Sequence, residues 1–350
     1  MHDEFKSKQS IFFSVLLVVR NEEKYISRLI ETLLKQEFPI ENYELIIIDG
    51  CSSDNTLGIV EDYRKKYPDF IRVYNNNKKT LPAGWNIGIK QSKGQYVLRL
   101  DGHTEVPNDF LLNNWETIKK QPEATCVGGI IISKGHGFQG SINEYVYSHP
   151  FGVGSSKFRT LNEDWEGFVE TVPYGAYKKE IFDEIGCFNE DLKRNEDIEF
   201  HRRVYNYGGQ FFLSTKIRST YYVRDSLKGL INKSLGDGTW SMIANQVTPG
   251  SLSVYKKAPL YTFLSGVALF IGAFLHSVFF WLFMLALLSY TLLNSIVSIK
   301  FARKKGIQFF LPCFIAFFCM HFFRGLGSFL AYFKMEYWIY KKQLLFKKTN

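Results

Sequence analysis

Two side chains that can bind a metal ion follow an apolar stretch near residue 100. The stretch YVLRLD, residues 96–101, ends in Asp101 and is followed by Gly102 and His103. In extended backbone, side chains two positions apart point the same way, so Asp101 and His103 can face one divalent cation. Gly102 between them leaves room for a ligand to approach closely. The alternative is a surface turn in which the carboxylate caps the backbone and the imidazole is solvated.

A second cluster of acidic residues opens a predicted helix at RNEDIEFHRRVYNYGG, residues 194–209. Asn195 is a suitable N-cap, and the glycine pair at 208–209 would end the helix. Glu196 and Asp197 then lie in the first turn, where the helix dipole favours the charged carboxylate that a general base requires. The alternative is that both acids only complement the dipole.

Four apolar stretches alternate with amphipathic ones in the first third of the chain. The apolar stretches are residues 12–19, 43–49, 70–76 and 95–101, and the helical patterns lie at 20–36, 56–67 and 83–92. Strands that are apolar throughout are typical of a mostly parallel sheet covered by helices on both faces. The sequence therefore predicts an α/β, Rossmann-like fold.

Polar residues gather where each predicted strand ends. They are Arg20, Asn21 and Glu22 after the first strand, Asp49 with residues 50–56 after the second, residues 75–79 after the third, and Asp101 with His103 after the fourth. In an open parallel sheet, ligands bind outside the carboxyl ends of the strands. For Ser52, Ser53 and Asp54, helix capping is the simpler interpretation. The shared location of all these residues predicts a ligand site at this edge. Neither the dinucleotide fingerprint nor the P-loop motif occurs in the sequence.

The C-terminal part contains two long apolar segments. The 41 residues from Pro259 to Ile299 include no charged residue, and residues 307–333 include only Arg324. Because one spanning helix needs roughly 20 residues, we predict a helical hairpin at 259–299 that turns near residues 276–277. The segment 307–333 could span the membrane, enter and return, or lie at the interface. We therefore divide the chain into a domain, 1–247, whose residues 226–247 form an interfacial helix, and a membrane module, 248–350.

The positive charge is concentrated in the membrane module. The net charge is +9, yet twelve of the 43 Lys and Arg residues follow Thr248 with a single acid, leaving 31 bases against 33 acids before it. Basic residues next to apolar segments favour the cytoplasmic side and anionic lipid head groups. We expect a multi-pass protein of the cell membrane with residues 1–247 in the cytoplasm, and membrane lipids rather than nucleic acid as partner. The five cysteines are scattered and suggest neither disulfides nor a zinc site.

Several motifs in order along the chain resemble family 2 glycosyltransferases. They are SVLLVVRNEEKYISRLIETLLKQ at 14–36, YELIIIDGCSSDNT at 43–56, LPAGWNIGIKQSKGQYVLRLDGH at 81–103, GCFNEDLKRNEDIEFHRRV at 186–204 and HFFRGLGSFLAY at 321–332. The chain looks most like the membrane-bound exopolysaccharide and capsule enzymes of the succinoglycan glucosyltransferase type. This resemblance implies a GT-A fold and the transfer of a sugar from a nucleotide donor with inversion.

The resemblance also implies roles for individual residues. It assigns donor binding to Arg20, Asn21, Glu22, Asp49, Lys79, Asn86, Arg99 and Asp101, metal binding to Asp101 and His103, and catalysis to Asp197 and Glu196. Trp240 is a candidate for acceptor binding, and so is Arg324, because a charge within an apolar run is costly and suggests a function. Asp197 matches the family's base, and Glu196 is the second candidate. Because imidazole is a borderline ligand, Mn²⁺ is expected in preference to Mg²⁺. Trp240 could instead anchor at the membrane interface, and Arg324 could extend to the membrane surface.

The expected reaction is the metal-dependent, inverting transfer of a hexose from a UDP-sugar to a polyprenyl-diphosphate-linked saccharide. Two departures from the family pattern bear on it. Asp49 is followed by Gly50 where many relatives carry a second acid, and the usual D-x-D reads Asp101-Gly102-His103. The alternatives are transfer to polyprenyl phosphate itself and a catalytically silent subunit that binds nucleotide sugars.

Overall fold

The computed structural model describes residues 11–349, and the chain divides into two compact units. One unit comprises the residues up to Ile132 together with Leu161–Tyr222, and the other comprises Ser133–Thr160 and the residues from Val223 onward. This division differs from the boundary predicted at residue 247. The predicted interfacial helix is present as α10 (Leu227–Val247), but α10 packs mainly against the C-terminal helix α13 (Phe310–Leu330) and therefore belongs to the second unit.

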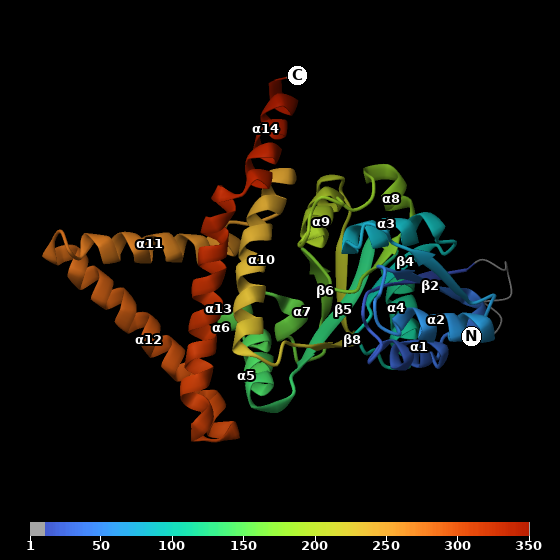
Figure 1. Ribbon diagram of the computed structural model, residues 1–350, viewed down its shortest axis with the longest axis horizontal. Coiled ribbons are helices and arrows are strands. Elements are labelled where there is room, and N and C mark those ends of the chain that lie inside the picture. Colours follow the sequence, from blue (N-terminus) through green and yellow to red (C-terminus); the bar gives the residue numbers. More distant parts are fainter. Residues whose placement is uncertain (1–10, 350) are drawn as a thin grey trace. The chain divides into compact units, whose positions relative to one another are not determined.

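The first unit is built on one eight-stranded sheet with the order β3-β2-β1-β4-β7-β5-β8-β6 (Figure 1). Its strands are β1 (Phe13–Val19), β2 (Tyr43–Asp49), β3 (Ile71–Asn75), β4 (Tyr96–Asp101), β5 (Cys126–Lys134), β6 (Glu166–Val169), β7 (Ala176–Lys178) and β8 (Phe211–Tyr222). Its helices are α1 (Ile26–Leu34), α2 (Thr56–Lys66), α3 (Leu81–Gln91), α4 (Phe110–Lys120), α8 (Glu180–Ile185) and α9 (Glu196–Asn206), with a short 3₁₀ turn η1 (Ile40–Asn42). The predicted α/β fold is confirmed.

The four predicted strands form the parallel half of the sheet. β1 pairs in parallel with β2 and β4, and β2 pairs in parallel with β3. All seven residues of β2 are buried, as expected for a strand covered on both faces. The register aligns Val19 with Asp49, and Asp49 with Asn75. The loops that carry the polar residues of the sequence therefore leave the sheet at one common edge.

The other half of the sheet is antiparallel. β7 runs antiparallel to both β4 and β5, and β6 runs antiparallel to β8. Strand β7 is only three residues long, yet it joins the two halves of the sheet. The loop before β7 and helix α9 after it supply further side chains close to the end of β4, as the contacts below show.

The second unit is helical. It contains α5 (Gly137–Ser148), α6 (Pro150–Val153), α7 (Lys157–Thr160), α10, η2 (Tyr255–Lys257), α11 (Ala258–Gly272), α12 (Ser277–Lys305), η3 (Ile307–Phe309), α13, η4 (Ala331–Phe333) and α14 (Met335–Thr349). The break between α11 and α12 lies beside the turn predicted at residues 276–277. Two segments are long and apolar enough to cross a membrane, namely Ser277–Lys305 and Ile307–Phe333, by length and composition alone.

Candidate active site

The predicted metal ligands Asp101 and His103 lie at the end of β4, where side chains from two neighbouring loops contact them. The Nδ1 atom of His103 lies 3.0 Å from Oε1 of Glu22, and the hydroxyl of Tyr174 donates to Oδ2 of Asp101 at 3.2 Å. A Cβ atom built on Gly102 would come within 2.9 Å of the side chain of Glu22, so a larger residue does not fit there without movement. The loop after β1, the end of β4 and the loop before β7 thus meet at this point.

These residues fit a divalent cation that is held largely by its substrate. Among the residues that the structure describes, no cluster of three or more His, Cys, Asp or Glu side chains could hold a metal ion. Ions that bind nucleotide phosphates commonly need only one or two protein side chains, because the phosphates supply other ligands. Asp101 and His103 meet that need, and the contact with Glu22 resembles the carboxylate that orients a metal-bound imidazole.

The loops after β1 and β2 are joined by a network of hydrogen bonds. Asp49 accepts from the hydroxyl of Ser52 at 2.5 Å and from its backbone N–H at 3.1 Å, and the Ser52 hydroxyl accepts from the backbone of Asn21 at 3.0 Å. In return, Oδ1 of Asn21 accepts from the backbone of Ser53 at 2.8 Å. Asn21 and Cys51 have positive φ values of 58° and 56°. Non-glycine residues in this conformation cluster at functional sites, where the surrounding contacts stabilise them.

The other predicted donor contacts have different surroundings. Arg20 and Lys79 are exposed at the same edge of the sheet, and Lys79 also has a positive φ value, 59°. Asn86 is buried on α3 and exchanges hydrogen bonds of 2.9 Å with both backbone atoms of Phe188. It also donates to Glu190 at 2.9 Å. Asn86 therefore fastens the segment before α9 to α3, a structural role that its position in the sequence did not indicate.

The predicted catalytic carboxylates lie in the first turn of α9. The helix begins at Glu196, as expected, and Oδ1 of Asp197 accepts from the backbone N–H of Ile198 at 2.8 Å. The side chain of Asn195 makes no capping hydrogen bond, so the predicted cap is wrong. The reason is its left-handed backbone, with φ 59° and ψ 25°, whereas an N-cap residue normally has an extended backbone.

Arg99 is the charged centre beside these carboxylates. Its side chain is buried, and its guanidinium lies 4.7 Å from the ring of Phe188, 5.2 Å from Trp85 and 5.6 Å from Tyr177. Burial lowers the pKa of Arg99, but Tyr177 and the charges of Asp197, Glu196 and Asp101 outweigh burial and raise it overall. Two guanidinium nitrogens, Nε and Nη1, have no hydrogen-bond partner among residues 11–349. Arg99 thus supplies a fixed positive charge to a site that brings three carboxylates together.

The two adjacent carboxyls of α9 differ in their surroundings. The pKa of Glu196 is raised to about 7, first because the carboxyl is buried and second because Asp197 is negatively charged, while Arg99 opposes both effects. At neutral pH the Glu196 carboxyl is therefore protonated in a substantial fraction of the molecules. Two carboxyls whose environments separate their pKa values can take different roles in one reaction.

Replacing Glu196 by glutamine should remove a pH dependence of stability. The pKa of Glu196 is about 7 in the folded chain against an ordinary value of 4.5, so over that interval the folded chain keeps a proton that the unfolded chain releases. Stability therefore falls as the pH rises from 4.5 to 7. We expect the thermal midpoint of Glu196→Gln to exceed that of the parent by a few degrees at pH 8 and to match it at pH 5. An equal difference at both pH values would contradict this.

A chain of buried polar groups, which the sequence analysis did not identify, lies behind the site. The imidazole of His201 bridges the hydroxyls of Thr171 and Tyr177, at 2.6 Å each, and Tyr177 in turn lies against Arg99. His201 follows Asp197 by four positions on α9, a spacing that places both on one helix face. That spacing was the available signal. Nothing in the sequence indicated that Tyr174 would contact Asp101. Tyr174 lies directly before Gly175 and has a positive φ of 45°.

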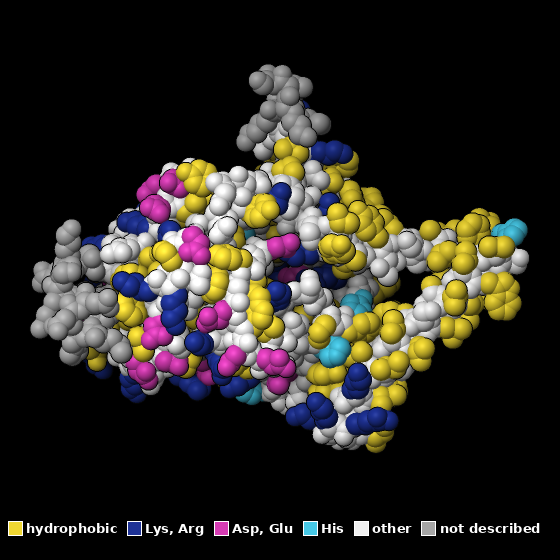
Figure 2. Space-filling model, turned by 180° about the vertical axis from the view of Figure 1, so that it is seen from behind, with side chains coloured by type: hydrophobic (Ala, Val, Ile, Leu, Met, Phe, Trp, Pro, Cys, Tyr) yellow, Lys and Arg dark blue, Asp and Glu magenta, His cyan; other side chains and the backbone are white. Residues whose placement is uncertain are grey.

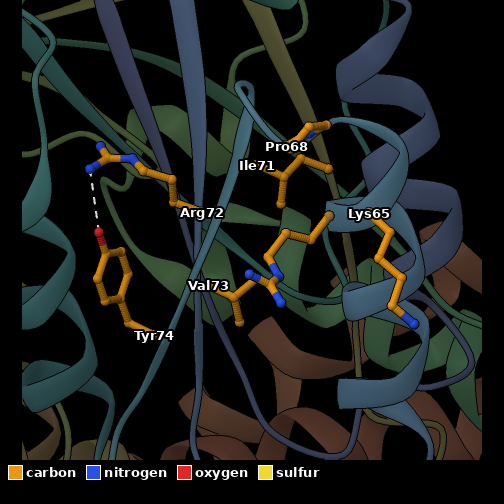
Figure 3. A pocket seen from close by; sticks show the side chains of 7 residues that line it. Lys65, Pro68, Ile71, Arg72, Val73 and Tyr74 are labelled. Carbon is orange, nitrogen blue, oxygen red and sulfur yellow. Dashed lines mark hydrogen bonds between the residues drawn. The ribbon is translucent and has the colours of Figure 1, made fainter.

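A hollow of about 350 Å³ opens elsewhere, along the outer edge strand β3 (Figure 3). Its lining residues are Arg64, Lys65, Pro68, Ile71, Arg72, Val73 and Tyr74. Arg72 is held there by Glu44 and by the hydroxyl of Tyr74 at 3.3 Å. None of the predicted site residues lines this hollow, and we assign it no part in the reaction. Trp240 on α10 and Arg324 on α13 belong to the second unit, and their acceptor roles stay predictions.

Comparison with known proteins identifies the family. Residues 14–186 match the model of glycosyl transferase family 2. A relative from Methanococcus voltae is 34% identical over 233 residues, which are 65% of this chain and 72% of that protein. It is named dolichyl N-acetyl-alpha-D-glucosaminyl phosphate 3-beta-D-2,3-diacetamido-2,3-dideoxy-beta-D-glucuronosyltransferase. The poly(ribitol-phosphate) beta-glucosyltransferase of Bacillus spizizenii is 30% identical over 55% of this chain but only 29% of its own length.

The fold is shared with a solved structure. The mannosyltransferase PcManGT from Pyrobaculum calidifontis, in complex with GDP-Man and Mn²⁺, superposes with a TM-score of 0.58 at 13% sequence identity, covering 92% of this chain and 87% of that one. At this identity the likeness establishes the fold alone. The family match and the relative from Methanococcus voltae lead to one conclusion: the chain is a glycosyltransferase and belongs to family 2.

Proposed function

We propose that the chain transfers a hexose from a UDP-sugar to a polyprenyl-diphosphate-linked saccharide, with inversion, in the synthesis of a surface polysaccharide. The observation that carries this proposal is the grouping of Asp197 and Asp101, which are partly exposed, with the buried Glu196 and Arg99 in one charged site of the first unit. The name of the archaeal relative describes transfer onto a lipid-linked sugar, which supports an acceptor of the same class.

The transfer requires one base, and Asp197 is the residue we assign to it. The acceptor oxygen attacks the anomeric carbon, the bond from that carbon to the diphosphate oxygen breaks, and the proton of the acceptor hydroxyl passes to Asp197. Glu196 is the second candidate for the base, because burial raises its pKa to about 7 and it is half protonated at that pH. The positive charge of Arg99 interacts with both carboxyls and offsets the repulsion between them.

We assign the donor diphosphate to the edge formed by the loops after β1, β3 and β4. Arg20 and Lys79 are exposed there, and Asp101 and His103 would hold a divalent cation, Mn²⁺ in preference to Mg²⁺. Such an ion neutralises the charge of the departing nucleoside diphosphate. Asp49, with Asn21 and Ser52 around it, would contact the nucleoside, and Glu22 would orient the imidazole of His103.

We place the protein at the cell membrane with its catalytic unit on the cytoplasmic side. The two apolar segments of the second unit support an attachment to the membrane. The basic residues next to them, which include Lys300 and Arg303–Lys305, support the cytoplasmic side and a contact with anionic lipids. Trp240 and Arg324 are our candidates for contacts with the lipid-linked acceptor.

The donor and acceptor can be identified by mass spectrometry. Membranes that contain the chain are incubated with UDP-glucose, UDP-galactose, UDP-N-acetylglucosamine or GDP-mannose, and the lipid extract is analysed for the added mass. We expect a UDP-hexose to add one hexose to a polyprenyl-diphosphate saccharide. A product on polyprenyl phosphate itself would favour the alternative acceptor. The absence of both product and nucleotide release with all donors would indicate a silent subunit and contradict the proposal.

A further inference from the structure

The helices α11 and α12 expose apolar side chains over most of their surface, apart from the residues that pack against α13 and against each other. On α11 the exposed residues include Phe270 and Ile271, and the break that follows exposes 78% of Phe274 and 79% of Leu275. On α12 the exposed fractions are 69% for Trp281, 62% for Leu285 and 63% for Leu292. Figure 2 shows the two helices, α11 and α12, covered largely by hydrophobic side chains. A helix that is apolar on all sides is stable only when it is surrounded by protein or lipid.

Helix α13 has the composition of a spanning helix but is exposed on one side only. Its buried residues are spread over its whole length, from Cys313 to Ser328. Its exposed large residues form a single stripe, namely Leu311, Ile315, Phe318, Phe322 and Leu330. In the most apolar 18-residue stretch of Ile307–Phe333, which contains α13, 33% of the residues are buried, against 11% in that of α12. The two helices therefore differ in how much of their surface lipid could reach.

The main partner of α13 is α10, although α11, α12 and α5 also pack on it, and the backbones of α10 and α13 approach each other closely. The hydroxyl of Thr239 donates to the carbonyl of Gly327 at 2.9 Å. A Cβ atom on Gly327 would lie 2.2 Å from the carbonyl of Leu235, and one on Gly238 would lie 2.2 Å from the carbonyl of Arg324. Figure 1 shows the two helices running side by side. Because of this contact, α13 must lie at the same depth in or on a membrane as α10.

Helix α10 is too polar to enter hydrocarbon. It carries Lys228 and Asn232 at exposed positions, and Lys233 and Asp237 form an ion pair of 3.3 Å whose side chains stay partly exposed. A charged residue at the centre of a bilayer costs about 2.5–3.5 kcal/mol even on the most favourable scale. Because α13 cannot descend into the membrane without α10, the polar face of α10 keeps both helices at the membrane surface.

The length of α11 suits a hairpin that enters the membrane and returns, whereas α12, with 29 residues, is long enough to cross a hydrocarbon core. The 15 residues of α11 reach about 22 Å at 1.5 Å per residue, less than the roughly 30 Å of a hydrocarbon core. Basic residues mark both ends, Lys256 and Lys257 before α11 and Arg303–Lys305 at the end of α12. At the turn, the Nδ1 atom of His276 accepts from the backbone N–H of Val278 at 3.1 Å, which caps the start of α12.

We propose that the hairpin of α11 and α12 is a re-entrant membrane anchor, and that α13 lies on the membrane surface beside α10 with its apolar stripe against the lipid. Both ends of the hairpin and the whole of α13 then stay on one side of the membrane. This arrangement differs from the multi-pass topology predicted from the sequence. It does not depend on which sugar is transferred.

Spin labels at chosen depths test this arrangement. In the full chain Cys51 and Cys187 are replaced by serine, and Cys126, Cys313 and Cys319, which are buried, are kept. One accessible cysteine at a time is introduced by Trp281→Cys on α12, Phe318→Cys on α13 or Asn232→Cys on α10, and each is spin-labelled. The chain without an introduced cysteine shows the background labelling. The chains are placed in vesicles of phosphatidylethanolamine and phosphatidylglycerol. Accessibility to oxygen, which partitions into lipid, is compared with accessibility to a water-soluble nickel complex. Thermal unfolding of each labelled chain verifies that it is folded.

We expect the label at residue 281 to be deep in the membrane, the label at 318 to lie at head-group depth, and the label at 232 to be fully accessible from water. Residue 318 is near the middle of the segment 307–333, so a spanning α13 would place its label deepest of the three and overturn the proposal. A water-accessible label at 281, or a chain that does not bind these vesicles, would overturn the insertion of the hairpin. A second variant, Phe322→Cys, repeats the measurement on the same stripe if the first variant misfolds.

Discussion

Replacing Asp197 by asparagine should reduce sugar transfer by about 100-fold or more while leaving donor binding intact. The substitution keeps the size and hydrogen-bonding shape of the side chain but removes the carboxylate that would accept the proton, and general base catalysis contributes roughly 10²–10⁴-fold. The backbone of Ile198 can still donate to the amide oxygen that replaces Oδ1 of Asp197, so the first turn of α9 should persist. Turnover is measured with the donor and the lipid acceptor, and donor binding by calorimetry with the nucleoside diphosphate.

The neighbouring variant Glu196→Gln is the matched control. It changes one carboxyl to an amide in the same helical turn, next to the same Arg99. If Asp197 is the base, Glu196→Gln should retain most of the turnover at pH 6, where Glu196, with its pKa of about 7, is already largely protonated. A loss of two orders of magnitude in Glu196→Gln combined with near-normal turnover in Asp197→Asn would move the base to Glu196.

Substitutions at the end of β4 should change the choice of metal ion as well as the rate. His103→Ala removes one of two protein ligands, so we expect Mn²⁺ affinity to fall by more than the roughly 10-fold that loss of an outer-sphere partner costs. His103→Asp replaces imidazole by a carboxylate and should recover binding, with the preference moving toward Mg²⁺. Asp101→Ala should have the largest effect, because it removes the only carboxylate of the motif and the acceptor of the Tyr174 hydroxyl.

Binding of Mn²⁺ is measured by electron paramagnetic resonance in the presence of the nucleoside diphosphate, separately from turnover with Mn²⁺ and Mg²⁺. Tyr174→Phe is a graded control, since it removes a hydrogen bond to Asp101 but no ligand, and its effect should be smaller than that of His103→Ala. If His103→Ala binds Mn²⁺ as the parent does, then the imidazole is not a ligand. Exposed histidines in turns can usually be replaced at a cost within about 0.5 kcal/mol.

The two predictions concern opposite ends of one charged site. Arg99, on β4, lies two residues before Asp101 and is influenced by the charges of Asp197 and Glu196 on α9. The expectation that Arg99 would contact the donor diphosphate rested on its position in the motif. Its burial among Trp85, Tyr177 and Phe188 instead suits a charge that acts on the carboxyls without leaving its position.

The sequence by itself determined the parallel half of the fold and the edge at which the candidate site residues gather. The apolar run 43–49 became β2 without a change of boundary, because a strand that is apolar throughout is buried on both faces of a sheet. The start of α9 at Glu196 was also predicted correctly, although the side-chain cap by Asn195 on which that prediction rested is absent. These are local preferences, and they depend on neighbours that are close in the chain.

Only the tertiary structure decided which distant residues meet. The three-residue strand β7 is too short to show a pattern, and it exists because β4 and β5 pair with it on either side. Tyr174 reaches Asp101, and Asn86 binds the backbone of Phe188, across 73 and 102 residues of chain. The division into units also depends on such contacts, since α10 packs against α13 through glycines whose closeness no local pattern reveals. Periodicity predicts the face that a residue occupies, but the partner on that face is fixed only when the whole chain is packed.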